Sequence, residues 1–549
     1  MKDISILIGG KSGDGIESTA PIIAKLLASY GYYTHIYRDY PSLIRGGHTF
    51  SIIRGSKVKI TAIRDKVDVI LALNKECVDT HKNLIGKNTV VIYDKDVFET
   101  KGIGISLSSK TLEIGAPIVV RNMGLVGALA KTIGIDWNLA DKIIENNSPK
   151  KPELNVIISK FGFDNSVNKF ELVKSKAIKL PLFYGNETVA LGLAKAGLDM
   201  YIAYPMTPAS SVLHFLAEHD KDLNIKVIHP ESEIGVIMMA NGASYAGSRI
   251  AVGTSGGGFA LMTEGVSLSG MGEYPVAIVM SQRPGPATGL PTYSAQADLN
   301  FVMHSGHGEF SRLVVAPGDA EEAYYWSGQA LNLSWKYQIP SFIMVDKTIS
   351  ESVYTFDEKL TKSLKPESGD VWDKKGEYKR YKNTKNGVSP LAFPGDKRAI
   401  VKGTSYEHDE HGITIEDGPT SVIMTDKRLK KDVFLEKDIK KINPVNVYGN
   451  KKSKIAILCW GSNAGVAKEA AESLGIKVIQ PIVLAPFPFE SFSKALSGVE
   501  KIIDVETNAT AQLASLVSQF GVNVDDIILK YDGRPFNVDE LTKSLRGLI

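Results

Sequence analysis

Residues 3–37 read DISILIGGKSGDGIESTAPIIAKLLASYGYYTHIY, and this stretch decides the fold class. The apolar run Ile4–Ile8 predicts a strand that is buried on both faces. Apolar residues then recur at helical spacing over residues 16–30 and end at Gly31, a residue suited to a helix C-terminus. Tyr33–Tyr37 predicts a second strand. Strand, helix and strand in this order predict a parallel sheet and an α/β fold.

The same alternation continues along the chain. Val67–Leu73 and Val90–Tyr93 predict further strands of the first domain. A second, glycine-rich α/β segment starts near Tyr184. The last hundred residues predict strands at 455–458, 476–482 and 501–505 and helices at 464–474 and 511–520.

A chain of 549 residues is too long for one hydrophobic core. We expect several doubly wound α/β domains. The expected parts are an α/β domain at 1–175, a second at 184–360, a polar linker and connecting segment at 361–450, and a third α/β domain at 451–549.

Composition excludes several classes of protein. The 64 basic residues are nearly balanced by 61 acidic ones, so no nucleic-acid partner is indicated. No apolar window is long enough for a membrane span, and a cytoplasmic location is expected. Cys77 and Cys459 stand alone, which argues against a disulfide framework or an iron–sulfur cluster on this chain. The acidic, histidine-containing run at 407–411 is read as a solvated turn, and no metal site is predicted.

A glycine turn joins the first strand to the first helix. Gly9, Gly10, Gly13 and Gly15 stand where exposed N–H groups and the helix dipole can hold a phosphate. Ser18 replaces the last glycine of the dinucleotide fingerprint, so a tight turn without a ligand is an equal alternative.

Arg45 belongs to a second glycine-rich segment, Tyr40–His48. Its guanidinium could hold a phosphate or carboxylate, because it offers paired donors. Taken alone, the segment favours a solvated arginine in a surface loop.

Two proline-rich loops predict a substrate site. Thr207 lies between two prolines at 204–208, so its hydroxyl is presented from a stiff loop. Arg283 and Thr292 lie in a loop that follows the apolar strand Val276–Met280, the usual edge for ligands in open α/β sheets. A Pro-capped turn and a purely structural loop are the respective alternatives.

Glu233 opens a helix after a histidine, a proline and Glu231. Acidic residues in a first helical turn commonly serve only the helix dipole, and this reading is favoured by the pattern alone. A buried carboxylate here could instead bond a nitrogen of a cofactor ring.

Taken together, the motifs resemble the 2-oxoacid:ferredoxin oxidoreductases, and specifically the alpha subunit of the archaeal type with fused gamma and alpha parts. Residues 1–175 resemble the gamma part. Residues 184–360 are similar to a thiamine-diphosphate pyrimidine-binding domain, and 451–549, with Lys530–Phe536, are similar to a transketolase C-terminal domain. Gly257 departs from many members, which have proline there.

This resemblance implies a subunit that takes part in the CoA-dependent oxidative decarboxylation of 2-oxoacids, such as pyruvate and 2-oxoglutarate, to acyl-CoA and CO₂, with ferredoxin as electron acceptor. It implies that Glu233 is catalytic and contacts the pyrimidine of thiamine diphosphate. Thr207, Arg283 and Thr292 would bind the 2-oxoacid. The amino-terminal glycine turn and Arg45 would contact CoA.

The resemblance also implies a partner. Thiamine diphosphate with Mg²⁺ would be shared with a beta subunit that carries the diphosphate site and a 4Fe–4S cluster in a heterodimer. The segment Tyr293–Gln296 resembles the broad-substrate type and favours a general 2-oxoacid enzyme.

Two alternatives remain open from the residues. A nicotinamide-dependent dehydrogenase would place an acid at the end of the second strand, and Asp39 comes near that position. A non-catalytic scaffold subunit would make the joint presence of Thr207, Glu233 and Arg283 accidental.

Overall fold

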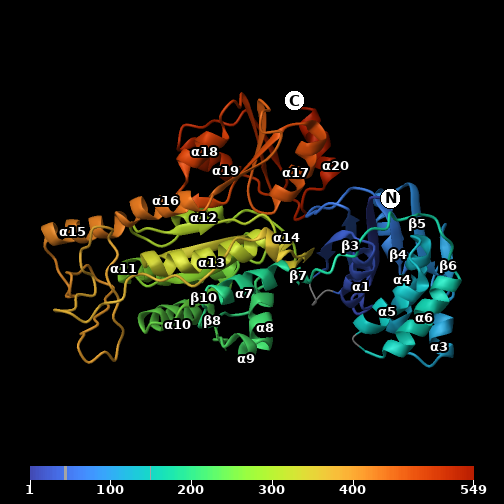
Figure 1. Ribbon diagram of the computed structural model, residues 1–549, viewed down its shortest axis with the longest axis horizontal. Coiled ribbons are helices and arrows are strands. Elements are labelled where there is room, and N and C mark those ends of the chain that lie inside the picture. The colour runs from blue at the N-terminus through green and yellow to red at the C-terminus, as the bar shows by residue number, and fades with distance from the viewer. Residues whose placement is uncertain (42–45, 149) are drawn as a thin grey trace. The chain divides into compact units, whose positions relative to one another are not determined.

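The protein is described by a computed structural model that covers residues 1–41, 46–148 and 150–549, so Arg45 lies outside the described residues. The chain forms two compact units (Figure 1). The first comprises Met1–Phe183, Glu351–Asp357 and Phe536–Lys543, and the second comprises Tyr184–Ser350, Glu358–Pro535 and Ser544–Ile549.

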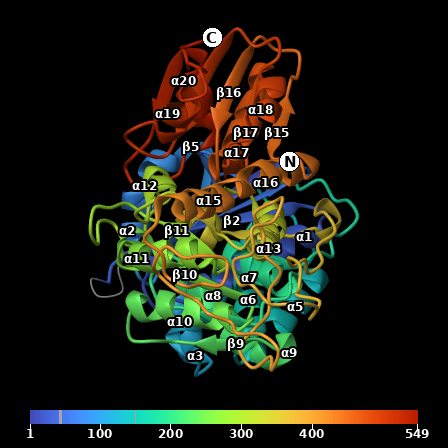
Figure 2. The same cartoon turned by 90° about the vertical axis from the view of Figure 1, so that its left-hand side faces the viewer.

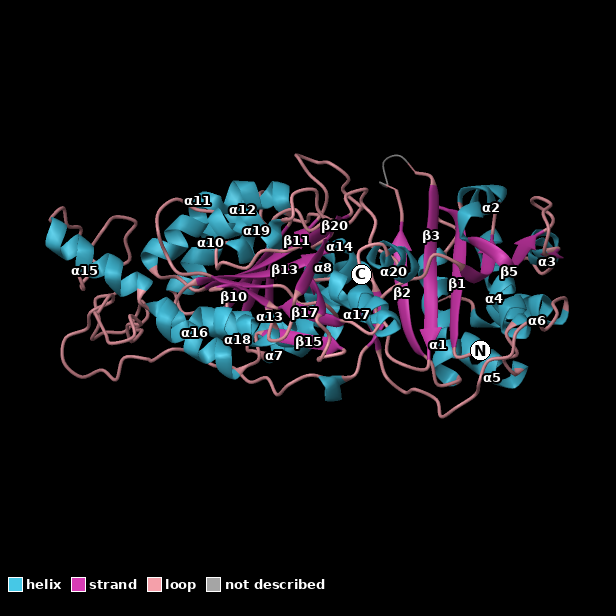
Figure 3. Ribbon diagram, turned by 90° about the horizontal axis from the view of Figure 1, so that it is seen from above, coloured by secondary structure: helices cyan, strands magenta, loops and turns pink. Residues whose placement is uncertain are grey.

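The first unit is built on a mixed sheet. Its strand order is β6-β5-β4-β1-β3-β2-β14-β7. The strands are β1 (Asp3–Lys11), β2 (Tyr33–Asp39), β3 (His48–Ser56), β4 (Val67–Ala72), β5 (Ile85–Asp94), β6 (Ile103–Ile105), β7 (Leu182–Tyr184) and β14 (Val353–Thr355). The α/β class is confirmed, but the expected all-parallel sheet is not. β3 lies between β1 and β2 and is antiparallel to both (Figure 3).

Helix α1 (Ile16–Ser29) follows β1 as expected, and Gly31 has a positive φ of 82° beyond its end. The other helices of this unit are α2 (Lys75–Thr80), α3 (Leu107–Glu113), α4 (Arg121–Thr132), α5 (Trp137–Asn147) and α6 (Pro152–Asp164). Helix α20 (Val538–Arg546) begins in this unit.

The position of β3 argues against the dehydrogenase alternative. A dinucleotide-binding unit needs its second strand beside the first, so that the acid reaches the ribose. Asp39 ends β2, which is two strand spacings from β1, or about 10 Å. Its carboxylate accepts a hydrogen bond from the Tyr37 hydroxyl at 3.2 Å.

The second unit contains a seven-stranded sheet with the order β18-β12-β13-β11-β10-β8-β9. Its strands are β8 (Met200–Ile202), β9 (Lys226–Ile228), β10 (Ile250–Thr254), β11 (Val276–Gln282), β12 (Leu313–Val315), β13 (Pro340–Asp346) and β18 (Val483–Ala485). All neighbours are parallel except β12 and β18. This is the predicted doubly wound arrangement.

Helices cover both faces of this sheet (Figure 3). One side carries α10 (Glu233–Tyr245), α11 (Gly256–Gly272) and α12 (Leu299–His304), and the other carries α7 (Gly185–Lys195) and α13 (Ala320–Tyr337). The remaining helices here are α8 (Ser210–Glu218), α9 (Asp220–Leu223) and α14 (Lys347–Glu351).

The C-terminal part of the second unit is a further α/β layer (Figure 2). Its sheet has the order β15-β17-β16-β19-β20, formed by β15 (Val445–Gly449), β16 (Ile455–Cys459), β17 (Lys477–Pro481), β19 (Lys501–Glu506) and β20 (Asp526–Leu529). Its helices are α17 (Asn463–Leu474), α18 (Phe489–Ala495) and α19 (Gln512–Ser518). β18 joins the seven-stranded sheet, and one hydrophobic core includes side chains of both parts.

Residues 361–450, expected to be a polar linker, pack into the second unit. They contain α15 (Gly418–Leu429) and α16 (Lys431–Lys441). Lys427 and Lys431 are buried and pair with Glu273 at 2.6 and 2.5 Å. The buried Arg380 donates to the Glu273 carbonyl at 2.9 Å. The polar composition reflects buried ion pairs as well as exposed surface.

Within the described residues, no helix is both long and apolar enough to cross a membrane.

Candidate functional site

The loops predicted to carry chemistry leave one edge of the seven-stranded sheet. β8, β9, β10 and β11 are parallel neighbours, so their carboxyl ends meet at the same edge. The loop at 204–208 follows β8, and Glu233 follows β9. The glycines at 256–258 follow β10, and Arg283 follows β11. Ligands of open α/β sheets bind at this edge.

Glu233 is the first residue of α10, after Ser232 as the N-cap. Its side chain is almost fully buried, at 4% exposure, whereas Glu231 is exposed. Its Oε1 atom has no hydrogen-bond partner among the described residues. A buried carboxylate oxygen without a donor is costly, and a carboxylate serving only the helix dipole would remain in water. The geometry therefore favours a ligand contact over the dipole reading.

The first turn of α11 approaches three parts of the site through its three glycines. A Cβ atom on Gly258 would lie 2.4 Å from Glu233 Oε1, and one on Gly256 would lie 2.8 Å from Asp298 Oδ1. A Cβ atom on Gly257 would lie 3.8 Å from the carbonyl oxygen of Ala287, in the loop that follows Arg283. The glycine turn thus lies between two carboxylates, and its missing side chains leave them space.

Thr207 and Arg283 are brought together as the sequence predicted. Arg283 Nη1 donates a hydrogen bond to the carbonyl oxygen of Thr207 at 2.8 Å. Asn186 also fixes the end of the loop that carries Thr207. Its side-chain amide donates to the carbonyl of Pro208 and to the hydroxyl of Ser211, both at 2.7 Å. Arg283 is half-buried, and its other N–H donors make no hydrogen bond to any residue that the structure describes.

Asp298 supplies negative charge near this arginine. Burial lowers the pKa of Arg283, and the charge of Asp298 opposes that shift. Burial in turn raises the pKa of Asp298 to about 6, against the effect of Arg283. The Oδ2 atom of Asp298 has no hydrogen-bond partner in the described part of the chain.

Thr292 is buried, and its hydroxyl has no partner among the residues that the structure describes. In that part of the chain, no direct hydrogen bond joins Thr292 or Glu233 to the pair Thr207 and Arg283. The residues that follow Thr292 are fixed by hydrogen bonds to the C-terminal part of the same unit. The Ser294 N–H donates to the Gly533 carbonyl at 3.0 Å.

Gln296 fixes the end of this loop to the C-terminal part of the same unit. Its side-chain amide donates to the carbonyl of Trp460 at 2.8 Å and accepts from Asn463 at 2.7 Å. Its backbone N–H donates to the carbonyl of Thr507 at 2.7 Å. The C-terminal layer thereby braces the loop that carries Arg283 and Thr292.

The amino-terminal glycines divide into two groups. Gly9 and Gly10 lie inside β1, and their lack of a side chain is explained by close packing. A Cβ atom on Gly9 would lie 2.6 Å from Cys77 Sγ, and one on Gly10 would lie 2.6 Å from Asp14 Oδ2. Within the turn, the carboxylate of Asp14 accepts a hydrogen bond from the Lys11 N–H at 2.8 Å. This N–H group is one of those expected to bind a phosphate, and it is already bonded inside the turn.

Gly13 and Gly15 lie beyond the strand, with positive φ of 96° and 74°. A Cβ atom on Gly13 would meet no described atom within 4 Å. Beside the start of α1 lies a cavity of about 340 Å³, whose lining includes Thr19, Asn122, Lys150 and Lys151.

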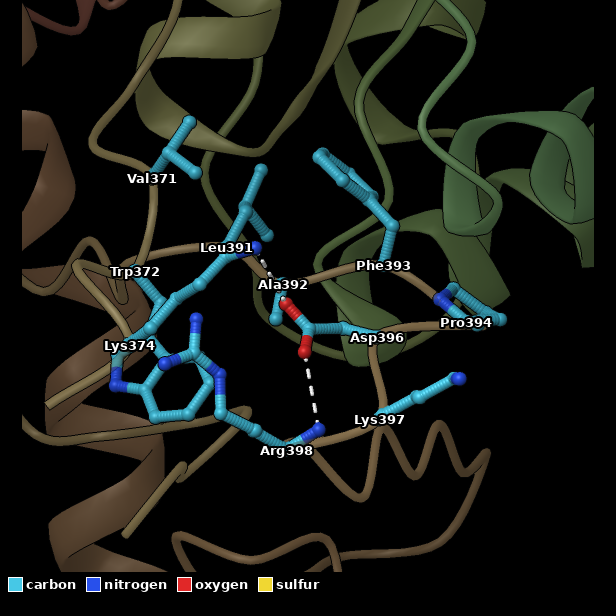
Figure 4. Close-up of a pocket in the computed structure, with 11 residues that line it drawn as sticks. Val371, Trp372, Lys374, Leu391, Ala392, Phe393, Pro394, Asp396, Lys397 and Arg398 are labelled. Carbon is cyan, nitrogen blue, oxygen red and sulfur yellow. Dashed lines mark hydrogen bonds and ion pairs between the residues drawn. The ribbon is translucent and has the colours of Figure 1, made fainter. Parts of the chain in front are cut away.

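A larger surface cavity of about 530 Å³ lies in the segment 371–398 (Figure 4). It contains none of the predicted site residues. Its carboxylate, Asp396, is already held by Lys374 at 3.3 Å and by the N–H of Arg398 at 3.0 Å. Trp372 forms part of its wall.

The run at 407–411 is occupied by internal pairs. Glu407 pairs with Arg428 at 2.6 Å, and Glu410 pairs with Lys379 at 2.8 Å. Across the described ranges, no group of three or more histidine, cysteine or acidic side chains could hold a metal ion.

Sequence reasoning missed Asn186 and Asp298. Asn186 stands in the first turn of a helix, and no sequence pattern indicates that its side chain bonds to Pro208, 22 residues later. Asp298 directly precedes an apolar helix, where an acid is normally read as an N-cap. The available signal was an acidic residue between the Pro-rich loop and the apolar helix.

Two protein-family models match the chain. The family described as pyruvate flavodoxin/ferredoxin oxidoreductase, thiamine diphosphate-binding, matches residues 192–427, and the family described as pyruvate ferredoxin/flavodoxin oxidoreductase matches residues 5–164. Among solved structures, the 2-oxoglutarate:ferredoxin oxidoreductase from Magnetococcus marinus, with 2-oxoglutarate, coenzyme A and succinyl-CoA bound, has a TM-score of 0.91 and 28% identity. It covers 100% of this chain and 99% of that chain.

Curated relatives agree over the full length. The 2-oxoacid:ferredoxin oxidoreductase subunit alpha of a Sulfolobus species is 34% identical over all of this chain and 97% of its own. Subunit alpha of 2-oxoacid:ferredoxin oxidoreductase 1 from Sulfurisphaera tokodaii is 33% identical over all of this chain and 98% of its own. With these matches and the site geometry together, the chain belongs to the alpha subunits of the 2-oxoacid:ferredoxin oxidoreductases.

Proposed function

We propose that this chain contributes the pyrimidine contact and the 2-oxoacid site to the CoA-dependent oxidative decarboxylation of 2-oxoacids, with ferredoxin as electron acceptor. The observation that carries the proposal is the buried Glu233 carboxylate with an oxygen that has no partner among the described residues. Gly258 lies close against this carboxylate, where a Cβ atom would come within 2.4 Å of Oε1.

Glu233 fits the aminopyrimidine of thiamine diphosphate. Its free oxygen would accept a hydrogen bond from a protonated ring nitrogen, and Gly258 keeps side-chain atoms out of that space. When bound, thiamine diphosphate supplies the electron sink for decarboxylation. The part played by this chain is to hold the ring and the proton on it.

The 2-oxoacid would be held by Arg283, Thr207 and Thr292. A guanidinium pairs well with a carboxylate. One N–H donor of Arg283 is already bonded to the carbonyl of Thr207. The buried Thr292 hydroxyl would give the keto oxygen a hydrogen bond. The segment Tyr293–Gln296 favours a general 2-oxoacid enzyme.

A beta subunit would complete the site. It would carry the diphosphate and Mg²⁺ contacts and a 4Fe–4S cluster, since the two cysteines here are buried and far apart in sequence. Helix α10 exposes Ile234, Met238 and Met239, and Leu261 is half-exposed on α11. Exposed apolar side chains beside a site suit a subunit contact.

CoA would bind in the first unit. Gly13 and Gly15 border α1, and the cavity of about 340 Å³ beside that helix includes Lys150 and Lys151, which suit phosphate groups. Arg45, outside the described residues, remains a candidate for the same ligand.

The test is Glu233→Gln in the assembled complex. Turnover should fall at least about a hundredfold, because a neutral amide cannot stabilise a protonated ring nitrogen in the same way. Subunit assembly and the 2-oxoacid KM should be retained. Ferredoxin or dye reduction gives the rate.

Glu231→Gln is the matched control, because Glu231 is exposed two residues earlier. Near-normal turnover in the Glu233 variant together with a large loss in the Glu231 variant would transfer the role to Glu231. Normal turnover in both would contradict the proposal.

A further inference from the structure

We propose that Asn186 is a positioning residue for the 2-oxoacid site, and that its side chain fixes the loop that presents Thr207 relative to the Arg283 guanidinium. The inference rests on the proposed role of Thr207 and Arg283 in binding the 2-oxoacid. It assigns a task to a buried amide that the decarboxylation chemistry does not use directly.

The Asn186 side chain bonds directly to the substrate loop. Asn186 lies in the first turn of α7 and is fully buried. Its amide nitrogen donates to the carbonyl of Pro208 and to the hydroxyl of Ser211, both at 2.7 Å. Pro208 directly follows Thr207, and Ser211 lies in the first turn of α8. One side chain therefore holds both the end of the loop and the helix into which it leads.

The partners of this amide determine its orientation. The carbonyl oxygen of Pro208 can only accept a hydrogen bond, so the nitrogen of Asn186 must face it. The amide oxygen, Oδ1, has no hydrogen-bond partner among the described residues. An apolar side chain could fill this space without burying an unpartnered oxygen, so the amide lowers stability relative to such a side chain. A local cost of this kind is expected where a residue serves a functional site.

The substrate loop has two consecutive carbonyl oxygens, and each accepts a hydrogen bond from a different element. Arg283, which directly follows β11, donates to the carbonyl of Thr207 at 2.8 Å. Asn186, at the start of α7, donates to the carbonyl of Pro208. The loop is therefore fixed between α7 and the end of β11. Without the bond from Asn186, the Thr207 hydroxyl can move relative to the guanidinium.

A second path joins the start of α7 to the end of β11. Gly185 packs so closely against α14 that a Cβ atom on it would lie 1.9 Å from the carbonyl oxygen of Ile349. The next residue of α14, Ser350, shares a hydrogen bond of 2.5 Å with Ser281 of β11. Both serines are fully buried, and Ser281 lies two residues before Arg283. The helix that carries Asn186 is thereby connected to the strand that carries Arg283.

Together the two paths form a closed ring of contacts. From Arg283 the ring passes through the loop of Thr207 to Asn186, and it returns through α14 and β11. Replacing Asn186 opens the ring at the loop, while Thr207 and Arg283 themselves stay unaltered. A ligand that is bound at two points needs its partners at a set spacing, so opening the ring should weaken binding of the 2-oxoacid.

The experiment measures KM and kcat for a 2-oxoacid in the assembled complex. Asn186→Ala should raise KM by about three- to tenfold and leave kcat within about threefold, because the loop loses one of its two fixed points. Thiamine content should stay the same, since Glu233 and the glycines at 256–258 are unaltered. A normal KM in Asn186→Ala would overturn the inference.

Asn241→Ala is the matched control. Asn241 is a buried asparagine of the same unit, and its Oδ1 also lacks a partner in the described part of the chain. Its amide donates to the carbonyl of Gly265 at 2.9 Å and so joins α10 to α11. Both variants should unfold at a lower temperature, but only Asn186→Ala should raise KM. An equal rise of KM in both would show a general effect of losing a buried amide, which also contradicts the inference.

Double variants separate this inference from the proposed function. Thr207→Val and Arg283→Ala should each raise KM, and Asn186→Ala should add little to either, because one of the two spaced contacts is already lost. An unchanged KM in both Thr207→Val and Arg283→Ala would refute the substrate site itself. A raised KM in these two variants, with full additivity of Asn186→Ala, would refute only the role of Asn186.

Ser350→Ala gives an independent answer if Asn186→Ala does not assemble. It opens the same ring between α14 and β11 and removes only a hydroxyl group. KM should rise about two- to threefold while kcat is retained, because the spacing of Thr207 and Arg283 is then fixed from one side only. In that case an unaltered KM in Ser350→Ala would refute the inference.

Discussion

Gly258 is a residue of the candidate site with little room for a side chain. A Cβ atom there would lie 2.4 Å from Glu233 Oε1 and 2.2 Å from Thr254 Oγ1. Gly258→Ala should therefore displace the carboxylate and lower turnover at least about tenfold. Turnover and thiamine content of the assembled complex measure the effect.

Gly257→Ala is the neighbouring comparison. The nearest described atom is 3.8 Å from its Cβ position, an ordinary contact, and alanine favours a helix over glycine by about 1 kcal/mol. This variant should lose much less turnover than Gly258→Ala. Equal losses in the two variants would show that the turn itself, and not the Glu233 contact, is sensitive.

Individual residues were predictable where chemistry and loop stiffness coincided. Thr207 and Arg283 stood out because prolines and glycines frame them, and the structure joins them by a hydrogen bond. Gly9 and Gly10 looked like ligand contacts, but they serve strand packing against Cys77 and Asp14, which only the folded chain brings near.

At the scale of elements, buried ion pairs stabilise the packing of α15 and α16 in the second unit. Glu273→Gln would leave Lys427 and Lys431 buried without their carboxylate. Breaking a buried pair in this way costs about 3–5 kcal/mol, so thermal unfolding should occur at a clearly lower temperature.

The free energy of unfolding of Glu273→Gln should change with pH in one direction. Burial lowers the folded-state pKa of Lys427 to about 7 from 10.5, and Glu273 opposes that shift. Without Glu273 the folded pKa falls further, so unfolding takes up protons up to about pH 10.5. The stability of the variant should therefore rise with pH over that range. Glu490→Gln, which alters an exposed pair with Lys440, should leave the unfolding temperature almost unchanged.

The exposed face of α10 provides a test of subunit contact. Met238→Lys should weaken assembly with a partner subunit, because Met238 is 48% exposed on the helix that begins at Glu233 and the lysine would place a charge in an apolar interface. Val422→Lys is the matched control on α15, where Val422 is 61% exposed. Size-exclusion chromatography of each mixture gives the result, and equal assembly of both variants would exclude this face.

Strands with long apolar runs were predictable to within a few residues, as β4 and β16 show. β3 was missed because Arg54 and Gly55 interrupt its pattern, and its pairing with β1 depends on contacts far along the chain. α15 and α16 were missed for a related reason. Their lysines read as solvated, and their partner Glu273 lies 154 residues before Lys427.

At the scale of the whole molecule, the seven-stranded sheet and the C-terminal layer share one core, so residues 184–350 and 358–535 act as a single unit. The sequence indicated separate domains, because each α/β pattern is complete by itself. The antiparallel addition of β18 to β12 is a tertiary contact that no local pattern reveals.

The most direct test of the account is reconstitution of activity from separate chains. The purified chain should be colourless and inactive, since Cys77 and Cys459 are both buried and cannot assemble a cluster alone. Mixing it with a cysteine-rich partner subunit, thiamine diphosphate and Mg²⁺ should give CoA-dependent reduction of ferredoxin by a 2-oxoacid. Ferredoxin reduction by this chain without a partner, or by the partner without this chain, would contradict the account.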